Sequence, residues 1–266
     1  MNYNGNKYIG EINTNKYGET FKIIEYNHYN DIIIEFLNDA HYIKHTNYTY
    51  FKEGRVASPY AKRTYGVGYL GEGKYTFTDK NNLDSKGHAI KTICFNHWQS
   101  MMYRCYGEKF QKKTSYINCT VCEEWHNYTN FEKWYEANYY TIDDEIMCLD
   151  KDILVKGNRV YSPNTCVFVP TRINTLFEKR NKSKYGMPIG VIQRRENKHA
   201  ISYRAKCRNI YGKRITSKTF NNQIDCFYEY KRIKEETFKE AANLYNDKIP
   251  KKLYVAMCNW IIEEDD

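Results

Sequence analysis

Short apolar segments that alternate with polar residues dominate the first third of the chain. Residues 21–26 and 31–36 are rich in Ile, Phe and Tyr, and a polar stretch of four residues separates them. Two β-prone runs with so short a polar connection are typical of a β-hairpin. Residues 48–51 form another aromatic run, predicted as a further strand, and a loop sequence containing Gly and Pro follows it. We therefore expect a small β module over residues 1–75.

The middle of the chain carries helical periodicity instead. Large apolar side chains recur every three or four residues between 91 and 106 and again between 123 and 138. This spacing predicts two helices, each with one apolar stripe. The side chains of the two stripes are Cys94, Trp98, Met101, Cys105, Trp125, Tyr128, Phe131 and Trp134. We expect both stripes to lie in the core rather than at a functional site.

The pattern changes again after residue 146. Residues 147–154 are typical of a strand, the Gly-Asn pair at 157 and 158 indicates a turn, and residues 160–161 form a short return strand. A Ser-Pro turn follows, and then a helical segment that reaches Asn174. The segment therefore predicts a hairpin followed by one helix.

Three β-prone runs and a long helical pattern make up the C-terminal part. The runs are residues 189–195, 201–208 and 213–219. In the middle run, Ser, Arg, Lys and Arg alternate with Tyr, Ala and Cys, so one face of the strand is cationic and the other is apolar. Apolar residues then recur every three or four positions from 227 to 244. We expect a three-stranded sheet whose apolar face is covered by a helix.

The composition limits the class of protein. Of the 266 residues, 16% are aromatic, which a disordered chain would lack. No apolar run approaches the ~18 residues that a membrane-spanning helix needs. The first residues also lack the apolar core of a secretion signal. We expect a folded, soluble protein of the cytoplasm that has no membrane partner.

Positive charge is concentrated in one stretch of the chain. The formal net charge is +9, and residues 181–220 alone contain 11 Lys and Arg against one acid, Glu196. So dense a patch is typical of a protein that binds a polyanion such as nucleic acid. The alternative is a basic face that contacts only solvent. Because the cations fall on expected strands, we favour the first interpretation.

Nine cysteines, all between residues 94 and 258, raise the question of a metal. Disulfides are not expected in a chain without an export signal. Cys119 and Cys122 have the spacing of half a zinc site. Completing that site would need Cys105, Cys148 or Cys166, none of which lies in a second such motif. Zinc is therefore a candidate cofactor, and buried thiols are the alternative.

Four short motifs of the middle segment follow one another at a compatible spacing. They consist of Trp98, Met101, Arg104, Cys105 and Tyr106, then Val121, Cys122, Glu124 and Trp125, then Leu149, Asp150 and Lys151, and finally Tyr161, Ser162, Pro163 and Cys166. Together they resemble the core of phage HNH endonuclease-like proteins over about residues 90–180. The resemblance implies a ββα-metal fold and metal-dependent hydrolysis of DNA.

The same resemblance implies roles for individual residues. Asp150 and Asn174 would hold a divalent cation, Mg²⁺ or Mn²⁺, beside the scissile phosphate. Lys151 stands where such enzymes have the general-base His, and Thr165 aligns with their central Asn, with Asn164 one residue early. A lysine is better suited to clamp a phosphate than to abstract a proton.

This departure at the base position leaves alternatives open. His97 and His126 are the nearest other bases, although surface positions on helices explain them as well. Asp152, two residues after Asp150, is a candidate supporting ligand. Without a base, the hairpin is a scaffold and the chain a non-catalytic, DNA-binding regulatory protein.

A second set of motifs lies in the C-terminal segment. Its members are Gly190, Val191, Tyr203, Arg204, Ala205, Gly212, Lys213, Arg214, Thr219, Phe220, Ala241 and Ala242. They resemble the plant ethylene-response-factor type DNA-binding domain, which phage nucleases also carry. The resemblance implies a sheet that enters the major groove of double-stranded DNA. By position, the candidate DNA-binding residues are Arg194, Arg195, Arg204, Lys206, Arg208 and Arg214, with Lys198 beside them.

These patterns combine into a prediction of a multi-module α+β protein. It has a small β module over 1–75, an HNH-like ββα-metal domain with helices over 76–182, and a three-stranded sheet packed on a helix over 183–266. The leading function is a metal-dependent DNA endonuclease of phage type, which nicks or cuts duplex DNA held by the C-terminal module in the bacterial host cytoplasm. Residues 1–75 are a candidate contact for a host protein.

Overall fold

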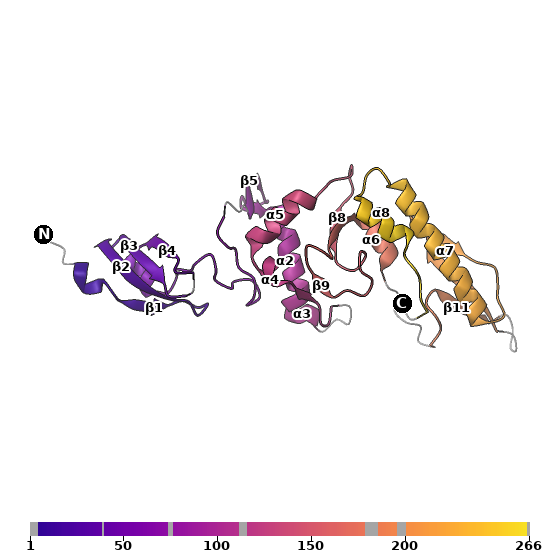
Figure 1. Ribbon diagram of the computed structural model, residues 1–266, viewed down its shortest axis with the longest axis horizontal. Helices are drawn as coiled ribbons and strands as arrows, with labels where there is room; N and C mark the ends of the chain where they lie inside the picture. Colours follow the sequence, from indigo (N-terminus) through magenta and orange to yellow (C-terminus); the bar gives the residue numbers. More distant parts are fainter. Residues whose placement is uncertain are drawn as a thin grey trace. The chain divides into compact units, whose positions relative to one another are not determined.

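The structure is a computed structural model that describes residues 5–38, 40–73, 77–111, 116–178, 186–195 and 201–264. The chain forms two compact units, Met1–Ala137 and Asn138–Asp266. It is a mixed α+β protein, 32% helical and 27% strand, and the described residues form several small sheets and no barrel (Figure 1). The predicted α+β class is therefore confirmed, whereas the division into three modules stays a prediction.

The first unit begins with a four-stranded antiparallel sheet. Its strands, in spatial order, are β1 (Ile12–Thr14), β2 (Thr20–His28), β3 (Asp31–Phe36) and β4 (Ile43–Thr46), preceded by the 3-10 helix η1 (Gly5–Tyr8). The predicted hairpin is confirmed as β2 and β3, with Phe21 directly opposite Phe36. Alternate residues of both strands are buried, and the residues between them are half-buried or exposed. The partner expected for residues 1–75 stays a prediction.

The aromatic run at 48–51 lies in a helix, α1 (Tyr48–Lys52), so its prediction as a strand was wrong. The side chain of Asn47 caps this helix by accepting a hydrogen bond of 2.8 Å from the Tyr50 amide. Asn is among the preferred N-cap residues. The helix brings Phe51 into the core against Phe21, with ring centroids 5.5 Å apart. The cap and this burial therefore outweigh the strand preference of the aromatic side chains.

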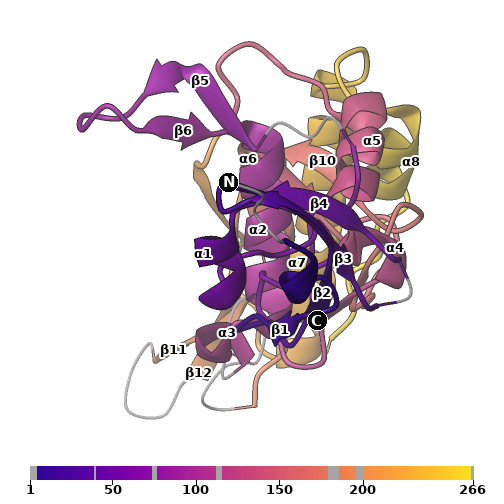
Figure 2. The same ribbon diagram turned by 90° about the vertical axis from the view of Figure 1, so that its left-hand side faces the viewer.

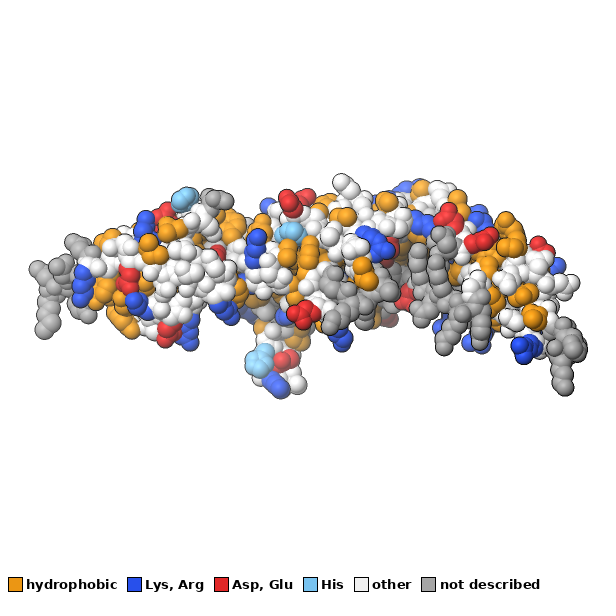
Figure 3. All heavy atoms as spheres, turned by 90° about the horizontal axis from the view of Figure 1, so that it is seen from below, with side chains coloured by type: hydrophobic (Ala, Val, Ile, Leu, Met, Phe, Trp, Pro, Cys, Tyr) orange, Lys and Arg blue, Asp and Glu red, His pale blue; other side chains and the backbone are white. Residues whose placement is uncertain are grey.

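The rest of the first unit is mainly helical. Its elements are β5 (Thr78–Leu83), β6 (Ala89–Lys91), α2 (Ile93–Tyr106), α3 (Glu108–Gln111), β7 (Thr120–Val121), α4 (Glu123–His126) and α5 (Tyr128–Asn138). The strands β5 and β6 form a hairpin that leads into α2 (Figure 2). Charged side chains of both signs lie at the exposed tip of this hairpin, where His88 lies 3.3 Å from Asp84 (Figure 3).

Both predicted helices of this segment exist, but the second is divided. The α2 stripe is confirmed as core, and the Trp98 indole N–H donates a hydrogen bond of 2.7 Å to the Trp125 carbonyl. The predicted helix over 123–138 breaks at Asn127, whose backbone is extended and whose side chain accepts from the Thr129 amide. Gly71 has a positive φ and leaves no room for a Cβ beside Asn127. A contact with a distant loop therefore fixes the break.

The second unit contains two small sheets and the longest helix. Its elements are β8 (Met147–Asp150), β9 (Val160–Tyr161), β10 (Val167–Pro170), α6 (Thr171–Phe177), β11 (Val191–Arg195), β12 (Ile201–Arg208), β13 (Arg214–Thr216), α7 (Gln223–Leu244) and α8 (Lys251–Cys258). β8 pairs with β10, and β11, β12 and β13 form a three-stranded antiparallel sheet. Helix α7 lies along this sheet (Figure 1).

A continuous hydrophobic core joins strands and helices of this second unit. It includes Val169 of β10, Ile173 of α6, Ala205 of β12, Phe238 of α7 and Leu253 of α8, each at most 1% exposed. The strand–helix segment of β8, β10 and α6 and the sheet of β11–β13 are therefore packed together. The predicted boundary at 182/183 lies inside this unit.

Within the part of the chain that the structure describes, no helix has the length and apolar character required to cross a membrane.

Candidate nucleic-acid interface

The three-stranded sheet places five cations on one of its faces. Strand pairing sets Arg194 opposite Ser202 and Arg208 opposite Arg214. Since directly paired residues share a face and alternate residues of a strand do too, one face carries all five cations. We call this set the cationic face; its members are Arg194, Arg204, Lys206, Arg208 and Arg214.

The opposite face of the sheet is buried under α7. Val191, Ala205 and Cys207 are at most 5% exposed and belong to the core. Gly190, at the start of β11, has a φ of +75° and lies so close to the Tyr230 ring that a Cβ would overlap it. The sheet is thus held against the helix on one side, and the five residues of the cationic face lie on the other.

A rigid turn sets the position of two of these cations. The Asn209 side-chain oxygen accepts hydrogen bonds from the amides of Tyr211, at 3.1 Å, and Lys213, at 2.9 Å. Gly212 supplies the left-handed residue, with φ +75°. The turn fixes Arg208 and Arg214 directly opposite each other. Like charges in that arrangement destabilise a sheet, so the pair has a cost that an anion would relieve.

The described residues provide no ion-pair partner for three of these arginines. Among the described residues, no ion pair involves Arg194, Arg208 or Arg214. The Arg204 guanidinium donates from Nε to the Thr219 hydroxyl at 2.9 Å, which orients it without neutralising it. The positive charge of Arg194, Arg208 and Arg214 is therefore not neutralised by an ion pair within the described part of the chain.

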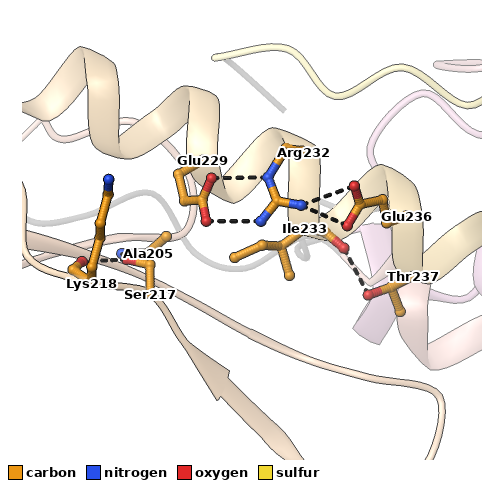
Figure 4. A network of polar contacts seen from close by, with 8 residues as sticks. All are labelled: Ala205, Ser217, Lys218, Glu229, Arg232, Ile233, Glu236 and Thr237. Atoms are coloured by element: carbon orange, nitrogen blue, oxygen red, sulfur yellow. Dashed lines mark hydrogen bonds and ion pairs between the residues drawn. The ribbon is translucent and has the colours of Figure 1, made fainter.

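Two carboxylates of α7, those of Glu229 and Glu236, form ion pairs with an arginine of the same helix. Arg232 contacts both Glu229 and Glu236 through paired hydrogen bonds of 2.8–3.0 Å along the outer side of the helix (Figure 4). These bonds also lower the pKa of Glu229. Across the sheet, the Ser217 hydroxyl joins Ala205 to Lys218 (Figure 4). The negative charges of Glu229 and Glu236 are thus paired with a cation of their own helix.

Of the cations predicted from the sequence, one lies apart from the cationic face and another cannot be assigned to it. Arg195 pairs with Ile201 and, by alternation, points to the side of the sheet opposite Arg194. Lys198 lies outside the described residues. The sequence did not distinguish Arg194 from Arg195, because only the strand register separates them.

The strand–helix segment differs in detail from its prediction. β8 ends at Asp150 and pairs with β10, with Asp150 opposite Val167, so residues 160–161 are not its return strand and residues 151–154 are not part of it. All four residues of β10 are buried, whereas Val160 is 39% exposed. Burial of an apolar run therefore decided the pairing. The helix that carries Asn174 follows β10 without a loop.

Asp150 is the residue that ends the strand. Its Oδ1 accepts hydrogen bonds of 2.9 Å from the amides of Asp152 and Ile153. Burial raises the pKa of Asp150 to about 6, and the nearby negative charge of Asp152 adds to this effect. The carboxylate thus closes a turn of its own backbone.

The residue at the expected base position is buried and paired. Lys151 is 7% exposed, and its ammonium lies 3.2 Å from an Asp152 oxygen and 5.9 Å from the centroid of the Tyr161 ring. Thr165 donates its hydroxyl proton to the Val160 carbonyl at 2.8 Å. Both side chains therefore make structural contacts within the loop.

Asn158, which the sequence marked only as a turn residue, ties this loop together. Its amide donates to the carbonyls of Lys151, at 2.7 Å, and Val160, at 2.8 Å. Asn174 is half-buried in α6, and in the described part of the chain no hydrogen bond joins it to Asp150. The structure thus brings Asp150, Lys151 and Asp152 together, and Thr165 closes the far end of the same loop.

No metal cluster is evident among the described residues, where no three His, Cys, Asp or Glu side chains converge. All nine cysteines are free thiols. Cys119 is buried, and Cys122 precedes α4, where burial raises the pKa of its thiol.

The two alternative bases lie in the first unit. His97 is half-buried beside the Tyr135 ring, and burial lowers its pKa to about 4. His126 lies at the end of α4, where its Nε2 is 3.1 Å from the Tyr106 hydroxyl. Both imidazoles thus contact side chains of their own unit.

Comparison with known proteins adds no relative: neither a family model, nor a curated protein, nor a solved structure matches this chain.

Proposed function

We propose that this chain is a DNA-binding protein that holds the phosphate backbone of duplex DNA against the cationic face of its C-terminal sheet. The observation that carries the proposal is the pairing of Arg208 with Arg214 on a face where no described acid forms an ion pair with either. Such a face lowers its electrostatic energy by binding a polyanion. Arginine also matches phosphate geometry through paired hydrogen bonds.

The salt dependence of binding tests this proposal most directly. Each phosphate contact releases counterions, so the logarithm of the affinity falls with the logarithm of the salt concentration by about 0.9 per contact. We expect a steep slope for the intact chain on a labelled duplex, measured by fluorescence anisotropy. Arg208→Gln should reduce the slope by about one unit. Lys239→Gln, an exposed lysine on α7, removes the same charge and should leave the slope nearly unchanged.

A salt-independent affinity, or equal effects of the two substitutions, would overturn the proposal. In the first case the contacts would not be phosphate contacts. In the second, the net charge of the chain rather than the cationic face would hold the DNA.

A metal-dependent endonuclease is the second candidate. One observation favours it: Asp150 and Asp152 lie close enough for their charges to interact at the end of a hairpin that runs directly into α6. Mg²⁺ is usually held by one or two carboxylates, with waters and substrate phosphates completing its coordination. This donor chemistry fits Asp150, with Asn174 as the second residue that the resemblance assigns. A bound Mg²⁺ or Mn²⁺ would neutralise charge on the scissile phosphate.

Nicking of supercoiled plasmid in Mg²⁺, Mn²⁺ or EDTA tests the nuclease. Asp150→Asn keeps an oxygen that can accept the two backbone amides but removes the charge that a cation needs. We expect metal-dependent nicking to be lost in this variant and kept in Asp144→Asn, an exposed control. Nicking that survives Asp150→Asn would exclude Asp150 as a ligand, and no nicking by the intact chain would leave only the binding function.

A further inference from the structure

A cavity of about 950 Å³ opens beside the cationic face. Helix α6, the turn between β12 and β13, and helix α7 form its walls. Cavities of this size fit a small ligand or a short flexible segment, whereas a DNA duplex is too wide to enter. The cavity therefore admits a narrower ligand than a duplex, although Lys206, Arg208 and Arg214 belong both to its lining and to the cationic face.

Positively charged side chains from α6, from the sheet and from α7 line this cavity. Its cations are Arg172 of α6, Lys206, Arg208 and Arg214 of the sheet, and Lys234 of α7. Glu178 is the one acid among the described residues that line it. Arg172 is half-exposed, and its Nε lies 3.4 Å from a Glu145 oxygen. Such a lining selects an anionic ligand.

An exposed aromatic ring lies at the mouth of the same cavity. Tyr211 is 64% exposed, whereas its neighbour Ile210 is 1% exposed and belongs to the core. The anchored Ile210 and the hydrogen bonds of Asn209 hold the backbone of this turn, so the Tyr211 ring is presented without a large loss of freedom on binding. Aromatic rings next to cations are the usual platform for unpaired nucleobases.

From this combination we propose that the cavity binds an unpaired stretch of a DNA strand, with phosphates on Arg172 and Lys234 and a base stacked on Tyr211. The inference rests on the proposed DNA-binding function and deepens it. The sheet would hold the duplex, and the cavity would take a single strand that leaves it. The preferred substrate is then a junction between double-stranded and single-stranded DNA.

The test compares a blunt duplex with the same duplex carrying a single-stranded tail of ten nucleotides that contains 2-aminopurine. With the full chain, we expect the tail to raise affinity about tenfold and the 2-aminopurine fluorescence to be quenched by stacking. Tyr211→Leu should abolish the quenching and most of the gain, while blunt-duplex affinity stays within about twofold. Arg172→Gln should reduce the gain but keep part of the quenching.

Tyr228→Leu provides the matched control, because Tyr228 is an exposed tyrosine of α7 that does not line the cavity. It should behave as the wild type in every assay. A tail that adds no affinity, or a Tyr211→Leu variant that loses blunt and tailed DNA equally, would overturn this inference and leave duplex binding intact. Failure to bind either DNA would overturn the proposed function itself.

Discussion

The loop after β8 and the sheet of β11–β13 differ in whether their charged side chains have partners close by. In the loop, the Asp150 carboxylate accepts two backbone amides, and the buried Lys151 lies against Asp152. In the sheet, Arg208 faces Arg214, and no ion pair of the described residues involves either. Both regions belong to the same compact unit and share its core.

This difference predicts which substitutions should change the stability of the chain and which should change its binding. A charge that is paired within its own loop stabilises the folded chain and has little left to offer a ligand. A pair of like charges on a sheet destabilises the fold slightly and is compensated only when an anion binds. Substitutions in the loop should therefore change the free energy of unfolding, whereas substitutions in the sheet should change DNA affinity.

The largest effect is expected from reversing the facing arginines. In Arg208→Glu/Arg214→Glu, two contacts worth about 1–3 kcal/mol each become repulsive, so duplex affinity near 0.1 M salt should fall at least about 100-fold. Thermal stability should change little, because a pair of like charges directly opposite each other is replaced by another such pair. Anisotropy and a melting curve measure the two quantities. The double reversal Lys239→Glu/Lys251→Glu, on exposed helix positions, is the control; a similar loss there would contradict the comparison.

His97 differs from both regions, because it is an ionisable side chain that burial keeps neutral. Its folded pKa is about 4, below the ordinary value of 6.5. Between these values the unfolded chain binds more protons, so the free energy of unfolding should fall as the pH falls, by about 1.5 kcal/mol from pH 6.5 to 5. His97→Gln should remove this part of the pH dependence.

Urea unfolding followed by tryptophan fluorescence measures this effect. A Trp260→Phe background leaves Trp98, Trp125 and Trp134, all in the first unit, as the reporters. The difference between the two pH profiles isolates His97 from the carboxylates. Identical profiles would show that the imidazole is not kept neutral.

A smaller change in stability is expected at Asp150. Asp150→Ala removes the acceptor of two backbone amides and should lower the free energy of unfolding by about 1–2 kcal/mol. Asp150→Asn keeps that acceptor and relieves the repulsion from Asp152, so its cost should be below about 0.5 kcal/mol. Duplex affinity in EDTA should not change in either variant. Loss of affinity without loss of stability would place Asp150 in the DNA interface and break the comparison.

The sequence predicted the sheet better than the loop, for a physical reason. The two-residue alternation along Ser202–Arg208 is set by neighbours in the chain, and the structure confirms the cationic and apolar faces that it predicts. The run Val167–Pro170 is compatible with a strand or a helix, and only burial among distant residues made it the partner of β8. The burial of Lys151 could not be predicted, because the neighbouring sequence does not show which distant residues cover this side chain.

The candidate site shows the same division. Five of the six predicted DNA-binding cations lie on one face, as their strand positions indicate. The cavity beside them escaped prediction, because Arg172, Tyr211 and Lys234 come from three elements and no local pattern relates them. Composition is the one feature of the sequence that indicates the proposed polyanionic partner: the stretch 181–220 holds 11 cations and one acid.

The smallest and most exacting prediction concerns the neighbours Arg194 and Arg195. They carry the same charge on adjacent positions of β11, yet Arg194 pairs with Ser202 on the cationic face and Arg195 with Ile201 on the other side. Arg194→Gln should weaken duplex binding about fivefold and lower the salt slope by about one unit, whereas Arg195→Gln should change affinity less than about twofold. Equal losses would mean that the DNA responds to the total charge of the strand and not to its register, which would remove the structural basis for distinguishing a binding face. A clear difference would assign the phosphate contacts to one side of the sheet, because the two variants differ in nothing but the direction of the side chain.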